Sequence, residues 1–267
     1  MEERRSTAAA ADPTWERRHP GGPESWSFDF VAPGGGVAGF VGLTIWSAPR
    51  RAWYWAALVG RRRPYLLVRD LEVAAPRAPT SREIRADGLW ADLNCETPHD
   101  HWSVGLEAFG VLLDDPDEAL GGERGERTGL GLDLEWEAAA PVVGGVGSYG
   151  QACSVHGEIL VGGGGGPVET ITFDGRGWRR HAWGKAVGWF TPASRLDGHL
   201  EDGRPFTATG LVPPAIDVLC RAPLRLELSS RRSVLERALC RFRTPEGSSG
   251  LAWSEHVVAP APGPAAG

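Results

Sequence analysis

The residues best suited to chemistry are His181 and Trp183, two positions apart in a segment that reads FDGRGWRRHAWG from residue 173 to residue 184. Alternate residues of an extended strand share a face, so Arg179, His181 and Trp183 are expected side by side. An imidazole can move a proton, and an indole face can line an apolar pocket or stabilise a cation. The segment therefore suits a site for an apolar ligand, and the alternative is a hydrogen-bonded histidine in a tryptophan-rich core.

A second constellation precedes this segment. Tyr149, Gln151 and Cys153 alternate, so they are expected on one face of a strand. Tyr and Gln are the polar groups that an otherwise apolar pocket uses to orient a ligand oxygen. The alternative is a strand start with Tyr149 on its rim.

A third constellation runs from Leu89 to Glu107 and contains two tryptophans, two histidines and several carboxylates. Pro98 and Asp100 predict a turn between two strands. Four of its side chains are candidates for the edge of a ligand cleft: Trp90, Glu96, Trp102 and Glu107. Solvated turn residues are the favoured interpretation for His99 and Asp100.

His99 and His101 also suggest a metal site, with Glu107 or His181 as a third ligand. A metal-binding barrel of the cupin type needs a second, downstream histidine motif, which this sequence lacks. The sequence therefore predicts no metal ion and no other cofactor.

The hydrophobic pattern has a period of two over most of the chain, which indicates half-buried β-strands. Alternating stretches lie at residues 130–136, 168–174, 224–228 and 251–257, and residues 53–59 and 65–73 predict a hairpin. Only residues 114–120 and 231–239 resemble helices, and the latter fits a strand equally well. Many short strands with Gly-rich turns predict an all-β fold of the sandwich or barrel type.

The glycine- and proline-rich stretch from residue 141 to residue 147 is the best candidate for a linker. It predicts an N-terminal β-domain at residues 23–140 and a C-terminal β-domain at residues 141–258. Residues 1–22 and 259–267 are polar or rich in Ala, Pro and Gly, and both are expected to be disordered.

Charge and composition exclude several classes of protein. The net charge is −6 and the only basic cluster is residues 61–63, so a nucleic-acid-binding face is not expected. The longest apolar run, residues 53–60, is too short to span a bilayer. Residues 1–11 lack the apolar core of a signal peptide, and the four cysteines form no CxxC motif, so a reduced cytoplasmic protein is expected. A single lysine among many Arg, Ala, Gly and Pro residues suggests a GC-rich bacterial genome.

These motifs together resemble AttH-like proteins, a family that includes the carotenoid 1,2-hydratases (hydroxyneurosporene synthases). The resemblance covers roughly residues 25–258. In the second half it rests on Tyr149-Gly150-Gln151, on His156-Gly157-Glu158 and on the pattern DGxGxRxHxWG from Asp174 to Gly184. In the first half it rests on Trp90 to Trp102, on Glu107-Ala108-Phe109 and on Gly131 to Trp136. The resemblance implies two lipocalin-like (calycin-type) antiparallel β-barrel or sandwich domains packed together, with an elongated apolar cavity.

The resemblance also implies roles for individual residues. In the hydratases a His-x-Trp pair is implicated in protonating an alkene, and the matching positions here are His181 and Trp183. Two departures disfavour carotenoid hydration itself. Arg180 stands where the family usually has Asp, and residues 204–210 lack the Tyr and Asp that the hydratases use downstream.

The sequence therefore predicts a protein that binds a small apolar molecule of the isoprenoid, steroid or polyketide kind, in or between its β-domains. Cofactor-free hydration, isomerisation or cyclisation is the expected chemistry, with His181 as proton donor and Trp183 as π wall. Tyr149, Gln151 and Arg179, with Trp90, Glu96, Trp102 and Glu107, are the expected ligand-binding residues. The alternatives are a non-catalytic carrier, a metal-dependent β-barrel enzyme, or a scaffold without a cavity. The sequence leaves the oligomeric state open.

Overall fold

Long strands with alternating burial dominate the structure. In the computed structural model, which describes residues 12–122, 124–162, 166–210 and 215–258, strand β7 (His101–Leu113) buries every second side chain over most of its length. Such a strand has one face in a core and one face outside it. The expectation of an all-β fold is confirmed, and the helical segments are four short 3₁₀ turns within the described residues.

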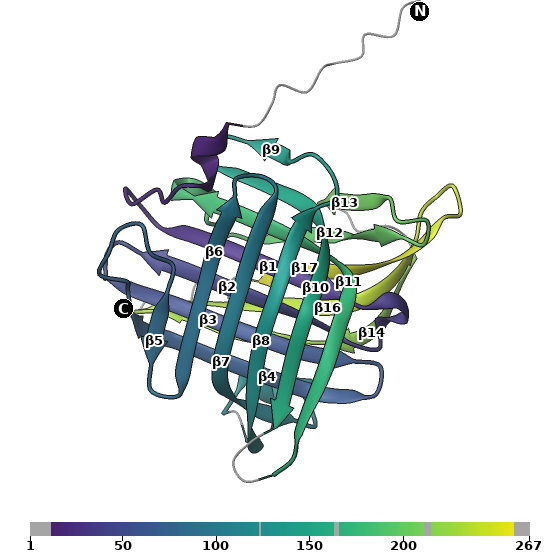
Figure 1. Cartoon of the computed structure of the whole chain (residues 1–267), viewed down its shortest axis with the longest axis horizontal. Coiled ribbons are helices and arrows are strands. Elements are labelled where there is room, and N and C mark those ends of the chain that lie inside the picture. Colours follow the sequence, from purple (N-terminus) through teal and green to yellow (C-terminus); the bar gives the residue numbers. More distant parts are fainter. Residues whose placement is uncertain (1–11, 123, 163–165, 211–214, 259–267) are drawn as a thin grey trace, which may run out of the picture.

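Eight strands form a closed antiparallel barrel (Figure 1). They are β1 (Glu24–Val31), β2 (Ala38–Trp46), β3 (Arg51–Gly60), β4 (Arg63–Ala74), β7, β8 (Glu126–Ala138), β10 (Ser148–Gly162) and β11 (Val168–Trp183). The ring closes in two places that sequence order does not suggest. β1 pairs with β11, and the residues from Tyr65 to Leu67 of β4 pair with those from Val111 to Leu113 of β7.

Three strands extend the barrel sheet without closing it. The hairpin of β5 (Ile84–Ala86) and β6 (Leu89–Thr97) pairs with the first part of β7, and β9 (Val143–Gly145) pairs with the start of β10. β9 and the first 3₁₀ turn, η1 (Pro13–Glu16), lie at the same end of the barrel, at the top of Figure 1. We refer to this end as the barrel mouth. The other 3₁₀ turns are η2 (Pro33–Gly35), η3 (Pro116–Leu120) and η4 (Gly184–Ala186).

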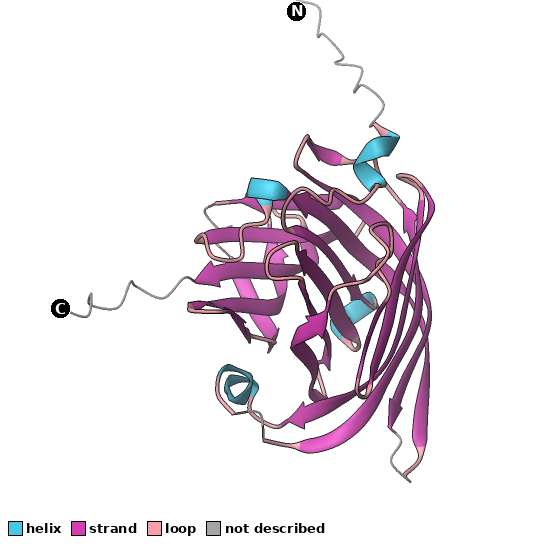
Figure 2. Ribbon diagram, turned by 90° about the vertical axis from the view of Figure 1, so that its left-hand side faces the viewer, coloured by secondary structure: helices cyan, strands magenta, loops and turns pink. Residues whose placement is uncertain are grey.

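A second, six-stranded antiparallel sheet lies against one side of the barrel (Figure 2). It consists of β12 (Ala193–Leu200), β13 (Pro205–Thr209), β14 (Ile216–Arg221), β15 (Leu224–Leu228), β16 (Arg231–Arg243) and β17 (Ser249–Val258). The segment from Arg231 to Leu239 is therefore a strand, and the helical alternative for it is excluded.

Two apolar layers hold the fold together. One fills the barrel and includes Trp26, Phe28 and Phe30 of β1. The other lies between the outer barrel wall and the second sheet, where Phe40 packs edge-to-face on Trp253 at 5.2 Å. Nine of the twelve tryptophans are buried: Trp26, Trp46, Trp53, Trp55, Trp102, Trp136, Trp178, Trp189 and Trp253. Most tryptophans are thus core residues, as large aromatic side chains usually are.

The change from one sheet to the other falls between β11 and β12, not at the expected linker. β10 and β11 follow residue 141 in the chain, yet they pair with β8 and β1 in the barrel. The stretch 141–147 is a crossing within the barrel sheet that contains β9. A boundary at residues 140/141 between two independently folding domains stays a prediction.

Thr44 of β2 joins the outer barrel wall to the segment before β12 through hydrogen bonds. Its hydroxyl donates to Ser25 Oγ at 2.9 Å and accepts from Trp189 Nε1 at 2.8 Å, and its side chain is fully buried. We expect Thr44→Val to lower the free energy of unfolding by about 1–3 kcal/mol, because it leaves the Trp189 donor buried without a partner. Urea denaturation measures the loss. Thr172→Val, at an exposed position of β11, is the control, and an equal loss in both variants would contradict the prediction.

Candidate functional site

Strands β10 and β11 direct four of the expected site residues into the barrel mouth. Directly paired residues of an antiparallel sheet share a face. Trp26, which lies in the interior core, pairs with His181, and His181 pairs on its other side with Tyr149. Arg179 pairs in the same way with Gln151. The two constellations that alternation predicted separately therefore form one interior cluster.

A glycine in the motif allows this approach of β11 to β1. A Cβ atom at Gly177 would collide with the backbone oxygen of Asp29. That oxygen accepts a hydrogen bond of 3.0 Å from Trp136 Nε1 inside the barrel. A side chain at residue 177 would thus separate the strands that carry the site.

The segment before β1 supplies residues that the sequence analysis did not assign to the site. Residues 1–11 of the expected disordered segment lie outside the described residues. Residues 12–22 correct that expectation, because η1 is capped by the Asp12 side chain, which accepts from Thr14 N at 2.8 Å. Trp15 stacks on Tyr149 with ring centroids 5.9 Å apart, and Glu16 is buried. The expected disordered tail, residues 259–267, also lies outside the described residues.

Glu16 and Arg179 form a buried ion pair in the mouth. Arg179 Nη2 lies 2.7 Å from Glu16 Oε1, and each side chain is only 2% exposed. Arg179 also donates to Tyr149 Oη at 3.3 Å and to Gln151 Oε1, and Tyr149 donates to Glu16 Oε2. Burial alone raises the pKa of Glu16, but the Arg179 charge and the Tyr149 hydrogen bond outweigh it, so the pKa is lowered. Glu16 is therefore an ionised carboxylate.

A second pair, Glu24 and His181, forms a hydrogen-bonded dyad beside the first. His181 Nε2 lies 2.9 Å from Glu24 Oε1, and both side chains are almost fully buried. Glu24 also accepts from Arg18 Nε at 2.7 Å and from the His19 backbone N–H at 2.9 Å.

The directions of the two pKa shifts in this dyad indicate which residue carries the proton. Burial raises the pKa of Glu24, but its hydrogen bonds with His181 and Arg18 outweigh burial, so the pKa is lowered. Burial lowers the pKa of His181, and Glu24 only partly opposes this. Glu24 is ionised and can only accept, so Nε2 of the neutral imidazole carries the hydrogen. Nδ1 then presents a lone pair, and it has no hydrogen-bond partner among the described residues.

Aromatic rings surround the free nitrogen of His181. The imidazole stacks on Trp26 with centroids 4.8 Å apart and lies 4.9 Å from the half-buried Trp183. The ring of His19 stacks on Trp183 at 4.1 Å with an interplanar angle of 6°. His181 and Trp183 thus both face into the mouth, as expected, but the 12–19 segment fills the space where the sequence suggested an open apolar cavity.

Several buried donors at the mouth have no acceptor in the described part of the chain. They include Trp26 Nε1, Trp102 Nε1 and Arg82 Nε. The Arg82 guanidinium lies over both indoles, 5.2 Å from Trp26 and 4.9 Å from Trp102. Buried donors are normally satisfied, so these groups are available to an oxygen acceptor at the mouth.

The other candidates from the third constellation lie elsewhere. Trp102 is buried at the mouth, whereas Glu96 is exposed and accepts from Ser103 Oγ at 2.8 Å. Trp90 and Glu107 pair with each other on the outside of the barrel, where they border a surface cavity with Leu160. Glu96, Trp90 and Glu107 are therefore not brought together with His181.

The histidines of the metal hypothesis are also separated. His99 contacts Glu16, whereas His101 lies 2.5 Å from Glu135 Oε2 on the other face of the sheet. In the described residues the group with metal-ligand spacing is instead His19, Glu24 and His181, whose donor atoms all lie within 4.8 Å of one another. Because Glu24 already accepts from Arg18, His19 and His181, this group is better suited to holding a proton than a cation.

The eight-stranded barrel with a second sheet on its wall is a lipocalin-like all-β fold. A family described as a domain of unknown function (DUF7064) matches residues 12–219, from the start of η1 into β14. The chain belongs to this family. No curated protein matches it in sequence.

A solved structure shows the same fold. An AttH-like protein from Nitrosomonas europaea matches with a TM-score of 0.58 and 10% identity, covering 94% of this chain and 97% of that chain. Kievitone hydratase from Nectria haematococca matches with a TM-score of 0.49 and 9% identity, covering 95% and 96%. The resemblance to AttH-like proteins is thus confirmed for the fold. In the described residues no helix is long and apolar enough to cross a membrane.

Proposed function

We propose that the barrel mouth binds a small, mainly apolar molecule that carries at least one oxygen, and that the Glu24–His181 dyad moves a proton on it. The observation that carries this proposal is the buried, unpartnered Nδ1 of His181, whose Nε2 is held by an ionised carboxylate at 2.9 Å. A histidine oriented by a carboxylate is the usual arrangement of a general base.

The proposed chemistry starts with the neutral imidazole. Nδ1 of His181 removes a proton from the ligand, and Glu24 stabilises the imidazolium that forms. The same nitrogen then returns the proton at another atom, which gives an isomerisation, or to a leaving hydroxyl oxygen, which releases water and gives a dehydration. Hydration is the reverse reaction, in which Nδ1 takes the proton from a water molecule whose oxygen bonds to one carbon of the alkene, and delivers it to the other carbon. His181 therefore acts first as a base and then as the proton donor that the sequence suggested.

The aromatic and donor groups have separate roles in this proposal. Trp183 forms the apolar wall, and an indole face stabilises developing positive charge. The free N–H groups of Trp26 and Trp102 bind the ligand oxygen and polarise it. The ligand reaches them when the segment 12–19 moves away from the mouth. The isoprenoid or steroid class of the ligand and the cytoplasmic location stay predictions.

The first experiment is native mass spectrometry of the protein purified from its own host, which identifies any small molecule that remains bound. With that molecule as substrate, we expect His181→Ala to lower turnover by about 10²–10⁴-fold while binding changes little, because the base is lost and the walls remain. His156→Ala, at an exposed position of β10, is the control and should behave like the wild type.

The pH profile gives an independent check. Since the pKa of His181 is lowered from 6.5, the active neutral form persists below pH 6.5, and activity should fall only on the acid side of that value. A bound molecule that is never converted, with binding unchanged in His181→Ala, would identify a carrier. Turnover unchanged in His181→Ala would remove the dyad from the mechanism.

A further inference from the structure

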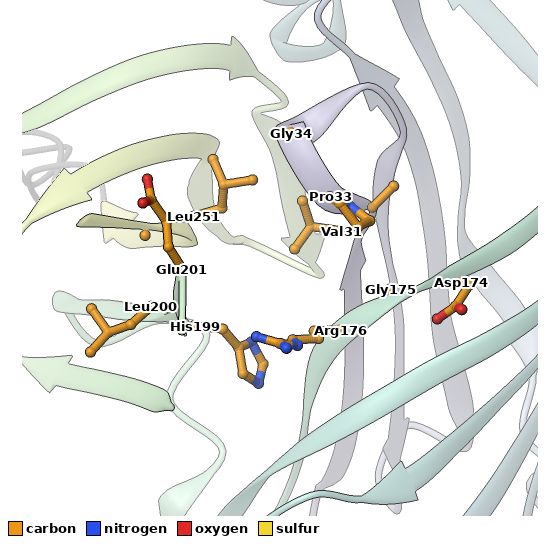
Figure 3. Close-up of a pocket in the computed structure, with 12 residues that line it drawn as sticks. Val31, Pro33, Gly34, Asp174, Gly175, Arg176, His199, Leu200, Glu201 and Leu251 are labelled. Carbon is orange, nitrogen blue, oxygen red and sulfur yellow. The ribbon is translucent and has the colours of Figure 1, made fainter. Parts of the chain in front are cut away.

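A cavity of about 370 Å³ lies between the barrel and the second sheet. The end of β1 and the middle of β11 form one side of it, and the ends of β12 and β17 form the other (Figure 3). Val31 pairs with Arg176 on the outer face of the barrel, whereas Phe28 and Arg179 point inward. The cavity is thus on the opposite face of β11 from the mouth and shares no side chain with the Glu24–His181 dyad.

His199 of β12 is the buried polar group of this cavity. Its side chain lines the cavity and is 6% exposed, and neither ring nitrogen has a hydrogen-bond partner among the described residues. Burial and the nearby Arg176 charge lower the pKa of His199 to about 4, so the ring is neutral at neutral pH. A neutral imidazole offers one N–H donor, and leaving it unsatisfied in a buried position is unfavourable.

Arg176 of β11 places a positive charge beside this imidazole. Figure 3 shows its guanidinium next to His199, with the carboxylates of Asp174 and Glu201 directed elsewhere. Arg176 forms no ion pair within the described part of the chain, and the nearby Asp202 is already bonded to Arg204 at 2.8 Å. A Cβ atom at residue 203 would lie 2.7 Å from Arg176 Nη2. Because this residue is a glycine, the guanidinium has room at this position.

Apart from Asp174 and Glu201, the other side chains of the walls are apolar. Val31 and Pro33 lie on the barrel side, and Leu200 and Leu251 on the side of the second sheet. A cavity of this size, with apolar walls and a few convergent polar groups, is typical of sites for small organic molecules. A guanidinium and a neutral N–H together match the two oxygens of a carboxylate.

We propose that this cavity is a second ligand site, which binds a small carboxylic acid with an apolar body through Arg176 and His199. The carboxylate accepts from the guanidinium and from the imidazole, and the apolar body packs between Val31, Leu200 and Leu251. This site is independent of the proposed function of the mouth.

Isothermal titration of the full chain with octanoate tests the proposal. We expect octanoate to bind the wild type, and Arg176→Gln to weaken it by about tenfold or more, because one charge-assisted hydrogen bond contributes at least 1.4 kcal/mol. Arg62→Gln, at an exposed turn, is the matched control and should leave binding unchanged. 1-Octanol, which has the same chain and no charge, should bind about tenfold more weakly than octanoate.

Three results would overturn the proposal. They are no binding of octanoate to the wild type, equal binding by Arg176→Gln and the wild type, and equal binding of inorganic phosphate and octanoate. Arg176 is an exposed residue, so Arg176→Gln should unfold at the same urea concentration as the wild type. His199→Gln tests the same site with a residue of the second sheet and should also weaken octanoate binding.

Discussion

Arg179→Met is expected to lower the free energy of unfolding by about 3–5 kcal/mol, because it leaves the Glu16 carboxylate buried without its counter-charge. Tyr149 and the His99 backbone N–H still donate to Glu16, but neither carries a positive charge. The loss is measured by urea denaturation at neutral pH. Arg62→Met, which removes an exposed arginine, is the control and should change stability by less than about 0.5 kcal/mol.

The double variant Glu16→Gln/Arg179→Met distinguishes an unpaired charge from a simple loss of packing. It leaves no uncompensated charge, so it should be more stable than Arg179→Met alone by at least about 1 kcal/mol. If the single variant loses less than about 1 kcal/mol, or the double variant is the less stable of the two, Glu16 does not lie in the mouth as an ionised partner of Arg179.

The second large effect is a pH dependence that belongs to Asp29, at the interface between the barrel and the second sheet. Asp29 accepts from the Trp178 backbone N–H at 2.9 Å and lies 3.4 Å from Arg237 Nη2. Burial, aided by the negative charge of Asp197 and only partly opposed by Arg237, raises the pKa of Asp29 to about 7. Between pH 3.8 and 7 the folded protein therefore holds a proton that the unfolded chain has released.

The stability of the wild type relative to Asp29→Asn should thus fall as the pH rises from about 4 to about 7, and stay constant above that range. The shift of about three pH units corresponds to a change on the order of 4 kcal/mol. Urea denaturation of both proteins at a series of pH values measures the difference, with Asp87→Asn as the exposed control. A difference that is flat across this range would mean that Asp29 is already ionised at pH 4.

Strand positions were predictable from sequence because alternation is a local property. The stretch 130–136 lies in β8, 168–174 in β11 and 251–257 in β17, and the hairpin of 53–59 and 65–73 is β3 and β4. Sheet membership was not predictable in the same way. β11 belongs to the barrel because it pairs with β1, more than 140 residues earlier in the chain. No pattern within β11 encodes that partner.

The site residues show the same difference between alternation within a strand and pairing between strands. Alternation placed Arg179, His181, Tyr149 and Gln151 on shared faces, and the direct pairing of β10 with β11 joined them. For Glu96 the register is decisive, because Cys95 rather than Glu96 pairs with Trp102, which turns Glu96 outward. Whether a given candidate faces the core thus depends on a register that composition does not reveal.

The carboxylates that complete the site were missed for a different reason. Glu24 opens β1 as a charged residue that is fully buried, against the usual preference of glutamate for the surface. Glu16 lies in a polar, Pro-rich segment whose composition indicates disorder. One signal was available: Asp12-Pro13-Thr14 has the side-chain cap and the first-turn proline that begin a helical turn.

The stretch of chain between Glu16 and Glu24 is attached to β11 at both of its ends. Each glutamate reaches a different residue of β11, Arg179 at 2.7 Å and His181 at 2.9 Å. Residues 17–23 form no helix or strand. Loss of the contact between Glu16 and Arg179 would therefore release the η1 end of this segment, while the Glu24 end stays fixed in β1.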